Sequence, residues 1–231
     1  MHTVAEERSR LAGVDLAGRD ASLSRALAQG LDTPLVALRA TMESLGQEVL
    51  QGARPVAQLR IDGVLRELER LEKNVRALCA FASPPVPHPL PCSLEEIVST
   101  ARAGLTSDQR RRVIAARSTP GAHLEVDGPL LGDCLRRLIE NALEASDDVV
   151  LVVARREPGQ ASLAVIDRGP SSLASDWQPL PFHTTKPNHL GLGLTLTRRD
   201  VELLNGRMEC LSTPSGDTCV RITIPCLEDD R

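Results

Sequence analysis

The chain has 231 residues and a formal net charge of -4 at pH 7, without any block of basic residues. This balance gives no reason to expect nucleic acid or an anionic membrane as a partner. Hydrophobic residues make up 42% and charged residues 25% of the chain, as in a globular protein. Because aromatic residues make up only 1%, the core must be built from Leu, Val, Ile and Ala, and base-stacking recognition of single strands is disfavoured.

The N-terminal part of the chain has the pattern of a long helix. Residues 1–21 form a segment of ambiguous character, in which Thr3 and Glu6 have the spacing of a capping box. Apolar residues then recur at spacings of three and four, which predicts one amphipathic helix. Its apolar stripe consists of Leu23, Leu27, Leu31, Leu35, Leu38, Met42, Leu45 and Val49. Gly52 and Pro55 mark a turn at its end.

A second amphipathic helix is expected after this turn. Its apolar stripe consists of Leu65, Leu68, Leu71, Val75 and Leu78. Two long helices joined by a short loop are antiparallel neighbours, so residues 22–82 are predicted to form a helical hairpin. Two helices alone leave apolar surface exposed, and we therefore expect a homodimer in which two hairpins form a four-helix bundle.

A proline-rich stretch marks the domain boundary. Residues 83–91 read SPPVPHPLP, with five prolines in nine residues, which predicts a stiff extended linker rather than a helix or a central strand. Residues 92–226 form the second domain, and residues 227–231 form an acidic, solvated tail.

The second domain is predicted to alternate helices and strands. Helices are expected near residues 93–104, 129–145 and 191–204, and strands near 113–116, 149–155, 162–167, 207–211 and 218–224. This order predicts an α/β two-layer sandwich with the helices on one face of a mixed sheet. With the helical hairpin before it, the whole chain is expected to have an α+β fold.

The six cysteines stand at positions 79, 92, 134, 210, 219 and 226, and no two of them form a C-x-x-C pair. Several fall on apolar positions of the expected elements, so we predict small core residues in a reducing compartment. The N-terminus lacks an apolar core of signal-peptide length, and the chain has no run of about 18 apolar residues. These features predict a cytoplasmic protein without a membrane-spanning segment.

Three stretches of the second domain carry residues suited to a ligand. They read LIENALEAS at 138–146, IDRGP at 166–170, and PFHTTK at 181–186 followed by GLGLTL at 191–196. An asparagine on an apolar helix, a glycine in a turn after a strand, or a glycine pair at a helix start is a weak signal by itself. Their order and spacing together make a strong one.

Together these stretches resemble the ATP-binding domain of sensor histidine kinases, within the superfamily that includes DNA gyrase, Hsp90 and MutL. The resemblance covers about residues 92–226. It implies a sandwich of the histidine-kinase and Hsp90 type that binds ATP or ADP together with Mg²⁺. It also implies a signalling protein of a two-component system.

The resemblance implies a role for each matching residue in the first two stretches. Asn141 would supply a side-chain oxygen to a Mg²⁺ ion that bridges the phosphates. Asp167 would accept a hydrogen bond from the adenine amino group and select a purine. Gly169 would let the backbone approach the base.

The third stretch matches the lid and the second glycine box of the family. Lys186 and the backbone N–H groups around Gly191 and Gly193 would contact the phosphates, at the start of a helix whose dipole favours negative charge. Thr185 and Leu194 belong to the same motifs and are counted with the nucleotide-binding residues.

The first helix carries a second resemblance. Residues 28–35, AQGLDTPL, resemble the phosphoacceptor helix of these kinases, which reads His-Glu-Leu-Arg-Thr-Pro-Leu. Pro34 keeps the kink, but Gln29 stands where the family has its reactive histidine, and Gly30 replaces the neighbouring acid. The lone pair of an amide nitrogen is delocalised, so Gln29 cannot accept a phosphoryl group, and Gly30 cannot take a proton.

Smaller departures affect the second domain. Arg137 precedes Asn141 by one turn, where the ATP-hydrolysing branch of the superfamily holds a catalytic glutamate, so hydrolysis of the gyrase or MutL type is not expected. Arg137 either contacts a phosphate as a fixed charge or faces solvent. His183 and His189, in the lid and beside the glycine box, are expected to be exposed loop residues.

Three functions are compatible with this pattern. The first is a histidine-kinase-like protein that binds nucleotide without autophosphorylation and acts through a response regulator or a partner kinase. The second is a response-regulator phosphatase, in which Thr33 positions the attacking water as the resemblance implies. The third is a kinase that acts in trans on a partner, for which the sequence offers no acceptor-selecting feature.

Overall fold

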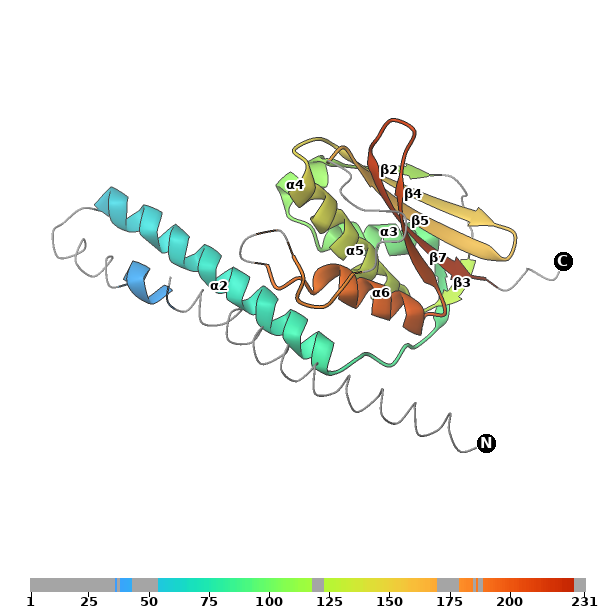
Figure 1. Cartoon of the computed structure of the whole chain (residues 1–231), viewed down its shortest axis with the longest axis horizontal. Coiled ribbons are helices and arrows are strands. Elements are labelled where there is room, and N and C mark those ends of the chain that lie inside the picture. Colours follow the sequence, from blue (N-terminus) through green and yellow to red (C-terminus); the bar gives the residue numbers. More distant parts are fainter. Residues whose placement is uncertain are drawn as a thin grey trace, which may run out of the picture. The chain divides into compact units, whose positions relative to one another are not determined.

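The chain divides into two units in the structure, a computed structural model (Figure 1). The model describes residues 36, 38–42, 54–117, 123–169, 179–184, 186 and 189–226. One unit comprises Met1–Ala82 and Phe182–Leu192, and the other comprises Ser83–Pro181 and Gly193–Arg231.

The first unit is built on α2, a helix of 29 residues at Arg54–Ala82. Of the helix expected before it, residues 36 and 38–42 are described, and these are helical. On α2, Asn74 and Leu78 are buried. Among the described side chains of α2, four large apolar residues are exposed, namely Ile61, Leu65, Leu68 and Val75. No helix among the described residues combines the length and the apolar character needed to cross a bilayer.

A five-stranded mixed sheet forms the centre of the second unit. Its strands are β2 (Val113–Arg117), β4 (Val150–Glu157), β5 (Gln160–Asp167), β6 (Arg207–Ser212) and β7 (Thr218–Pro225). They are ordered β2-β4-β5-β7-β6; β2 pairs with β4 in parallel, and the other pairs are antiparallel. Buried and half-buried residues alternate along β5, so one side of this strand faces the core.

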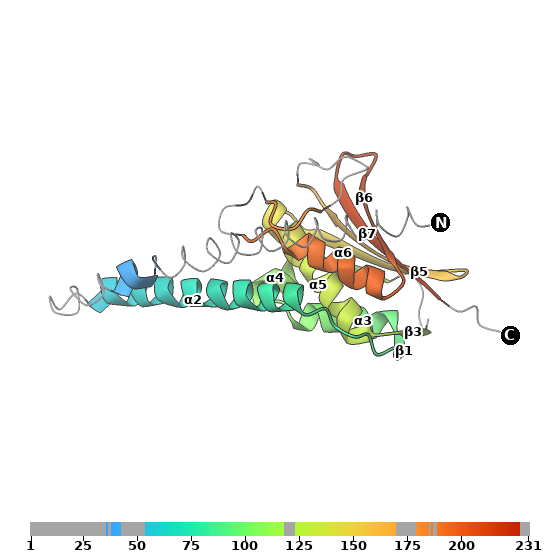
Figure 2. The ribbon, with the colours of Figure 1, turned by 60° about the horizontal axis from the view of Figure 1, so that its bottom comes forward.

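Helices cover one face of this sheet, as Figures 1 and 2 show. They are α3 (Leu94–Ala103), α5 (Gly128–Ala145) and α6 (Gly193–Leu203). Leu131, Leu135 and Ile139 of α5 are fully buried and belong to one core cluster with Val150, Leu163 and Ile222 of the sheet. The expected α+β fold, with a mixed sheet beneath helices, is confirmed.

Side chains cap the starts of α3 and α5. Ser93 and Glu96 form a capping box at the start of α3, with the Glu96 carboxylate 2.7 Å from the Ser93 nitrogen. Asp127 caps α5 by accepting a hydrogen bond from the Leu130 N–H at 2.9 Å. The other oxygen of Asp127 accepts from the His88 N–H, also at 2.9 Å, which ties the proline-rich stretch to the start of α5.

The end of that stretch differs from the expected linker. Leu90 and Pro91 belong to β1 (Leu90–Ser93), which pairs antiparallel with β3 (His123–Val126). Pro91 lies opposite Glu125 in this pair. A proline is tolerated because each strand of a two-stranded sheet is an edge strand with one set of N–H groups outside the ladder.

Besides β1, two short elements were not expected from the sequence. They are β3 and α4 (Ser107–Arg111), a helix of five residues with a capping box between Thr106 and Gln109. Four or five residues are too few to show a clear periodicity. The other helices and strands of the second unit lie within about two residues of their predicted bounds.

The prediction that the cysteines are small core residues is confirmed for three of them and is wrong for Cys79. All six are free thiols, and Cys134, Cys210 and Cys219 are buried. Burial raises the pKa of the Cys134 thiol to about 12, so this thiol stays neutral and unreactive at physiological pH. Cys79 is exposed on α2 and is not a core residue, because it lies beside the buried Leu78 but on a different side of the helix.

One buried carboxylate joins α5 to α6. Asp200 of α6 is 1% exposed, and its Oδ2 accepts a hydrogen bond from Nη1 of Arg137 at 2.6 Å. Its Oδ1 accepts from Nη2 of Arg199 at 2.7 Å. Arg137 therefore neither faces solvent freely nor stands ready for a phosphate, because its guanidinium compensates the buried charge of Asp200.

We expect Asp200→Ala to lower the free energy of unfolding by about 3 kcal/mol, because it leaves two partly buried guanidinium groups without their anion. Urea denaturation followed by circular dichroism measures this change. The matched control is Glu202→Ala on the same helix, where the lost ion pair with Arg198 is at the surface and contributes at most about 0.5 kcal/mol. Equal losses in the two variants would contradict the assignment.

Candidate nucleotide-binding site

The C-terminal end of β5 and the last turns of α5 meet at the candidate site. Asp167, the last residue of β5, is 5% exposed. Its Oδ1 accepts a hydrogen bond from the Gly169 N–H at 2.8 Å, which closes a tight turn after the strand. A carboxylate at the end of a buried strand is thereby held in a fixed orientation.

Gly169 has no room for a side chain. A Cβ atom at this position would lie 2.7 Å from Asp167 Oδ1 and 3.1 Å from the carbonyl oxygen of Ala145. The turn therefore rests against the end of α5, and only glycine permits this approach. The sequence predicts that Gly169 lets the backbone approach the base. In the structure, Gly169 lets the turn approach the end of α5.

Asn141 lies one turn before this contact. It is half-buried on α5, four residues before Ala145, and residues four apart share one face of a helix. One turn of α-helix rises about 5.4 Å. Asn141 and the Asp167–Gly169 turn therefore lie on the same side of α5.

Thr218 is a further residue of this site that the sequence motifs did not indicate. It begins β7, lies opposite Asp167 in the β5–β7 pairing and is buried. Its hydroxyl donates a long hydrogen bond of 3.4 Å to the Gly169 carbonyl oxygen. Only the strand register brings it there, and the sequence does not reveal which residue of a later strand faces Asp167.

The start of α6 supplies unpaired backbone donors. α6 begins at Gly193, and the first N–H groups of a helix have no partner within it. The carbonyl of Gly193 accepts a hydrogen bond from the Thr197 hydroxyl at 2.9 Å, while Leu194 packs against the core. A Cβ atom at Gly193 would meet nothing within 4 Å, so packing in this structure does not require glycine at this position.

The remaining predicted residues belong to the first unit or are not described. Gly191 has φ +67°, and a Cβ atom there would lie 2.6 Å from the His183 carbonyl oxygen, so glycine is required where the segment closes on itself. The Lys186 N–H donates to the Thr184 hydroxyl at 3.0 Å. His183 and His189 are exposed, as expected.

Several predicted residues lie outside the described part of the chain. They are Gln29, Gly30 and Thr33 of the first helix, and Thr185 of the lid.

Phe182, in the described part of the lid, packs edge-on against Phe81 of α2 with ring centroids 5.3 Å apart. This contact falls within the first unit.

Asn141 fits a magnesium ion better than a transition metal. Its amide oxygen is a hard donor of the kind that Mg²⁺ prefers, and Mg²⁺ in phosphate sites keeps water and phosphate oxygens as its other ligands. Among the described residues, no group of three or more His, Cys, Asp or Glu side chains is arranged to hold a metal by itself.

Comparison with known proteins identifies the family of the second unit. Residues 126–228 match the family described as histidine kinase-, DNA gyrase B-, and HSP90-like ATPase. The C4-dicarboxylate transport sensor protein DctB of Rhizobium meliloti is 29% identical over 201 residues, which is 83% of this chain and 32% of that protein. Sensor protein KdpD of Mycobacterium tuberculosis is 30% identical over 224 residues, which is 90% of this chain and 26% of that protein.

Solved structures show the same fold. Histidine kinase ThkA, in complex with response regulator protein TrrA, superposes with a TM-score of 0.74 at 18% identity, over 100% of this chain and 68% of that one. Histidine kinase AdeS of Acinetobacter baumannii gives a TM-score of 0.66 at 18% identity, over 86% of this chain and 98% of that one.

The chain spans from 26% to 57% of the length of the curated relatives it matches. Those relatives are named as sensor proteins and sensory kinases, and the match covers most of this chain in each case. The family match, these relatives and the shared fold agree with one another. Residues 126–228 therefore carry the ATPase domain of this family, and most of the chain is similar to sensor histidine kinases.

Proposed function

We propose that this chain binds ATP or ADP with Mg²⁺ and signals without a phosphoryl acceptor on its first helix, acting on a response regulator or a partner kinase. The observation that carries the proposal is the Asp167–Gly169 turn, which rests against α5 one turn from Asn141. The carboxylate of Asp167 can accept a hydrogen bond from the base of a nucleotide. The amide oxygen of Asn141 can bind a Mg²⁺ ion at its phosphates.

Each residue has a distinct task in this proposal. Asp167 accepts a hydrogen bond from the adenine amino group, while its Oδ1 keeps the Gly169 turn in place. Asn141 contributes its amide oxygen to Mg²⁺, which neutralises phosphate charge when it is bound. Gly193 begins a helix whose free N–H groups and dipole favour the phosphates. Lys186 and Gly191 are proposed to complete the phosphate contacts from the lid.

The proposed absence of autophosphorylation follows from the chemistry of Gln29. An amide nitrogen is not a nucleophile, and Gly30 offers no carboxylate to activate one. Nucleotide then acts on this chain as a ligand rather than as a phosphate donor to the hairpin. No described residue favours the phosphatase role of Thr33 over this proposal.

The proposed assembly is a homodimer through residues 22–82, joined by the stretch 83–91 to the ATP-binding domain at 92–226. Support comes from α2, on which Ile61, Leu65, Leu68 and Val75 are 39% to 52% exposed. A partner helix would remove this apolar surface from water. A response regulator is proposed as the partner because the related kinase ThkA is found in complex with one.

We expect Asp167→Asn to weaken binding of a non-hydrolysable ATP analogue with Mg²⁺ by about tenfold or more, measured by calorimetry. The amide keeps an acceptor for Gly169 but presents an N–H to the adenine amino group, so a charge-assisted hydrogen bond is lost.

Gly193→Ala should weaken binding without lowering stability, because its Cβ meets nothing in this structure. The matched control is Gly63→Ala on α2, also without neighbours, which should leave binding unchanged. Equal affinity in all three variants would count against the site.

We expect no acid-labile, base-stable phosphate on the hairpin after incubation with labelled ATP and Mg²⁺. Label retained on residues 22–82 in the native chain would refute this part of the proposal. The double variant Gln29→His with Gly30→Glu provides the positive control, since it restores the residues of the family pattern to a chain with the same ATP-binding domain.

We expect Leu68→Glu to shift the native chain from a dimer to a monomer of 24.9 kDa in light scattering after size exclusion. A charge placed in an apolar interface cannot be desolvated without a large cost. The control is Arg66→Glu at an exposed polar position two residues away, which should leave the dimer intact. A native chain that is already monomeric at micromolar concentration excludes the proposed assembly.

A further inference from the structure

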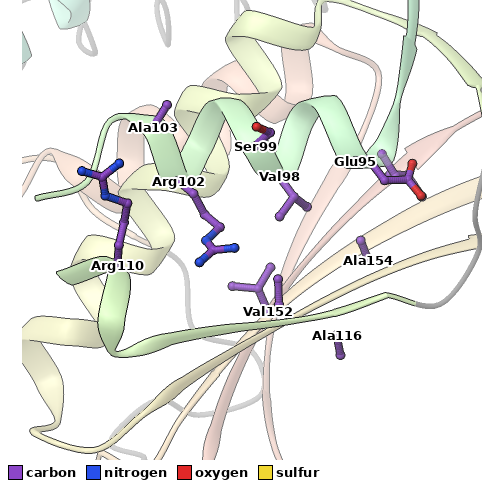
Figure 3. A pocket seen from close by; sticks show the side chains of 11 residues that line it. Glu95, Val98, Ser99, Arg102, Ala103, Arg110, Ala116, Val152 and Ala154 are labelled. Carbon is purple, nitrogen blue, oxygen red and sulfur yellow. The ribbon is translucent and has the colours of Figure 1, made fainter. Parts of the chain in front are cut away.

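A cavity of about 580 Å³ lies between α3 and the β2–β4 edge of the sheet (Figure 3). Val98 and Arg102 line it from the helix, and Ala115, Val152 and Ala154 line it from the strands. Its volume falls within the range of small-molecule sites. None of the residues assigned to nucleotide binding lines it, so it is separate from the site at Asp167 and Asn141.

Small side chains create this space. Ala115 of β2 and Ala154 of β4 stand where the sheet faces α3, and larger residues there would fill the gap. Protein interiors are packed closely, and voids much larger than one water molecule are few. A cavity of this size is therefore a site for solvent or for a ligand rather than a packing detail.

Two ionisable side chains that line this cavity each have one atom without a hydrogen-bond partner in the described part of the chain. Glu95 Oε2 and Arg102 Nε are shielded from solvent, and neither has a hydrogen-bond partner in the described part of the chain. Shielded polar atoms without partners are costly, and each calls for an explanation. Both side chains line the cavity, so a ligand there can offer a donor to the Glu95 carboxylate and an acceptor to the Arg102 guanidinium.

The positions of the charges set the length and polarity of that ligand. Glu95 and Arg102 are seven residues apart on α3, which is two turns or about 10 Å along one face. In Figure 3, Arg102 extends from α3 toward Val152, while Glu95 lies at the opposite end of the helix. Arg110 of α4 adds a second cation at the Arg102 end. Between the two ends the lining is aliphatic except for Ser99.

We propose that this cavity binds a small organic zwitterion with an aliphatic body. Its carboxylate pairs with Arg102 and Arg110, its methylene groups lie over Val98 and Val152, and its ammonium group pairs with Glu95. Arginine suits a carboxylate because its planar donors match the two oxygens. The cavity gives this kinase-family domain an input site that is independent of nucleotide.

The test uses the full chain and three probes, measured by calorimetry. The first probe is ω-aminooctanoate, which carries both charges; octanoate and octylamine each lack one of them. We expect saturable binding of ω-aminooctanoate with Kd near 1 mM or tighter, and at least tenfold weaker binding of the other two. Binding should persist when a non-hydrolysable ATP analogue saturates the chain. Absence of saturable binding, or competition with the nucleotide analogue, overturns the proposal.

Two variants locate the binding within the cavity. Arg102→Met should weaken ω-aminooctanoate binding about tenfold without lowering the melting temperature of the unliganded chain, because it removes a charge that has an unpartnered donor. Glu95→Gln should weaken ω-aminooctanoate but leave the weak binding of octanoate unchanged. The matched control is Arg111→Met, an arginine whose side chain is 80% exposed. Unaltered affinity in Arg102→Met and Glu95→Gln, or an equal loss in Arg111→Met, places the probe elsewhere and overturns the assignment.

Discussion

The candidate nucleotide site depends on the close approach of the β5 end to the end of α5. This approach exists because Gly169 lacks a side chain; a Cβ atom there would collide with Asp167 and with Ala145. Separating the two elements by even one methyl group would move Asp167 away from the helix that carries Asn141. The distance between a group suited to adenine and a group suited to Mg²⁺ is therefore set by backbone packing and not by flexible side chains.

The position of α6 follows from a second constraint, the buried charge of Asp200. Arg137 and Arg199 hold this carboxylate at 2.6 and 2.7 Å, and Cys134 packs in the same interface, with its Sγ 4.0 Å from the Thr197 carbonyl oxygen. The raised pKa of Cys134 keeps that thiol neutral, so it adds no second anion beside Asp200. The first turn of α6, with its free N–H groups, is thereby fixed against α5.

Local signals in the sequence predicted the main elements, while long-range pairings stayed hidden. The helices predicted near residues 93–104 and 129–145 correspond to α3 and α5, whose observed ends lie within about two residues. The partner of Arg137 is 63 residues away on another helix, and Thr218 faces Asp167 only through strand register. Such contacts depend on tertiary packing, which neither spacing nor composition records.

The cavity beside α3 could not be predicted from the sequence either. In the sequence, Ala115 and Ala154 are ordinary small residues of strands, and Glu95 and Arg102 are ordinary charges of an amphipathic helix. Only the fold brings small residues opposite the helix and leaves Glu95 Oε2 and Arg102 Nε without partners. Whether the space between two elements is filled depends on how they pack in three dimensions. A sequence pattern does not describe that packing.

Under the proposed function, nucleotide must act through differences in affinity. A ligand that is not consumed changes a partner only if it binds one conformation of the chain more tightly than another. Asp167 ends a strand and Asn141 lies within α5, so under this proposal they provide affinity rather than selectivity. The proposal assigns the selectivity to the predicted lid, because Lys186 and Gly191 are its proposed contacts with the phosphates. A chain without an acceptor histidine can then still report nucleotide to its partner, by the free energy with which the phosphates favour one arrangement of the lid.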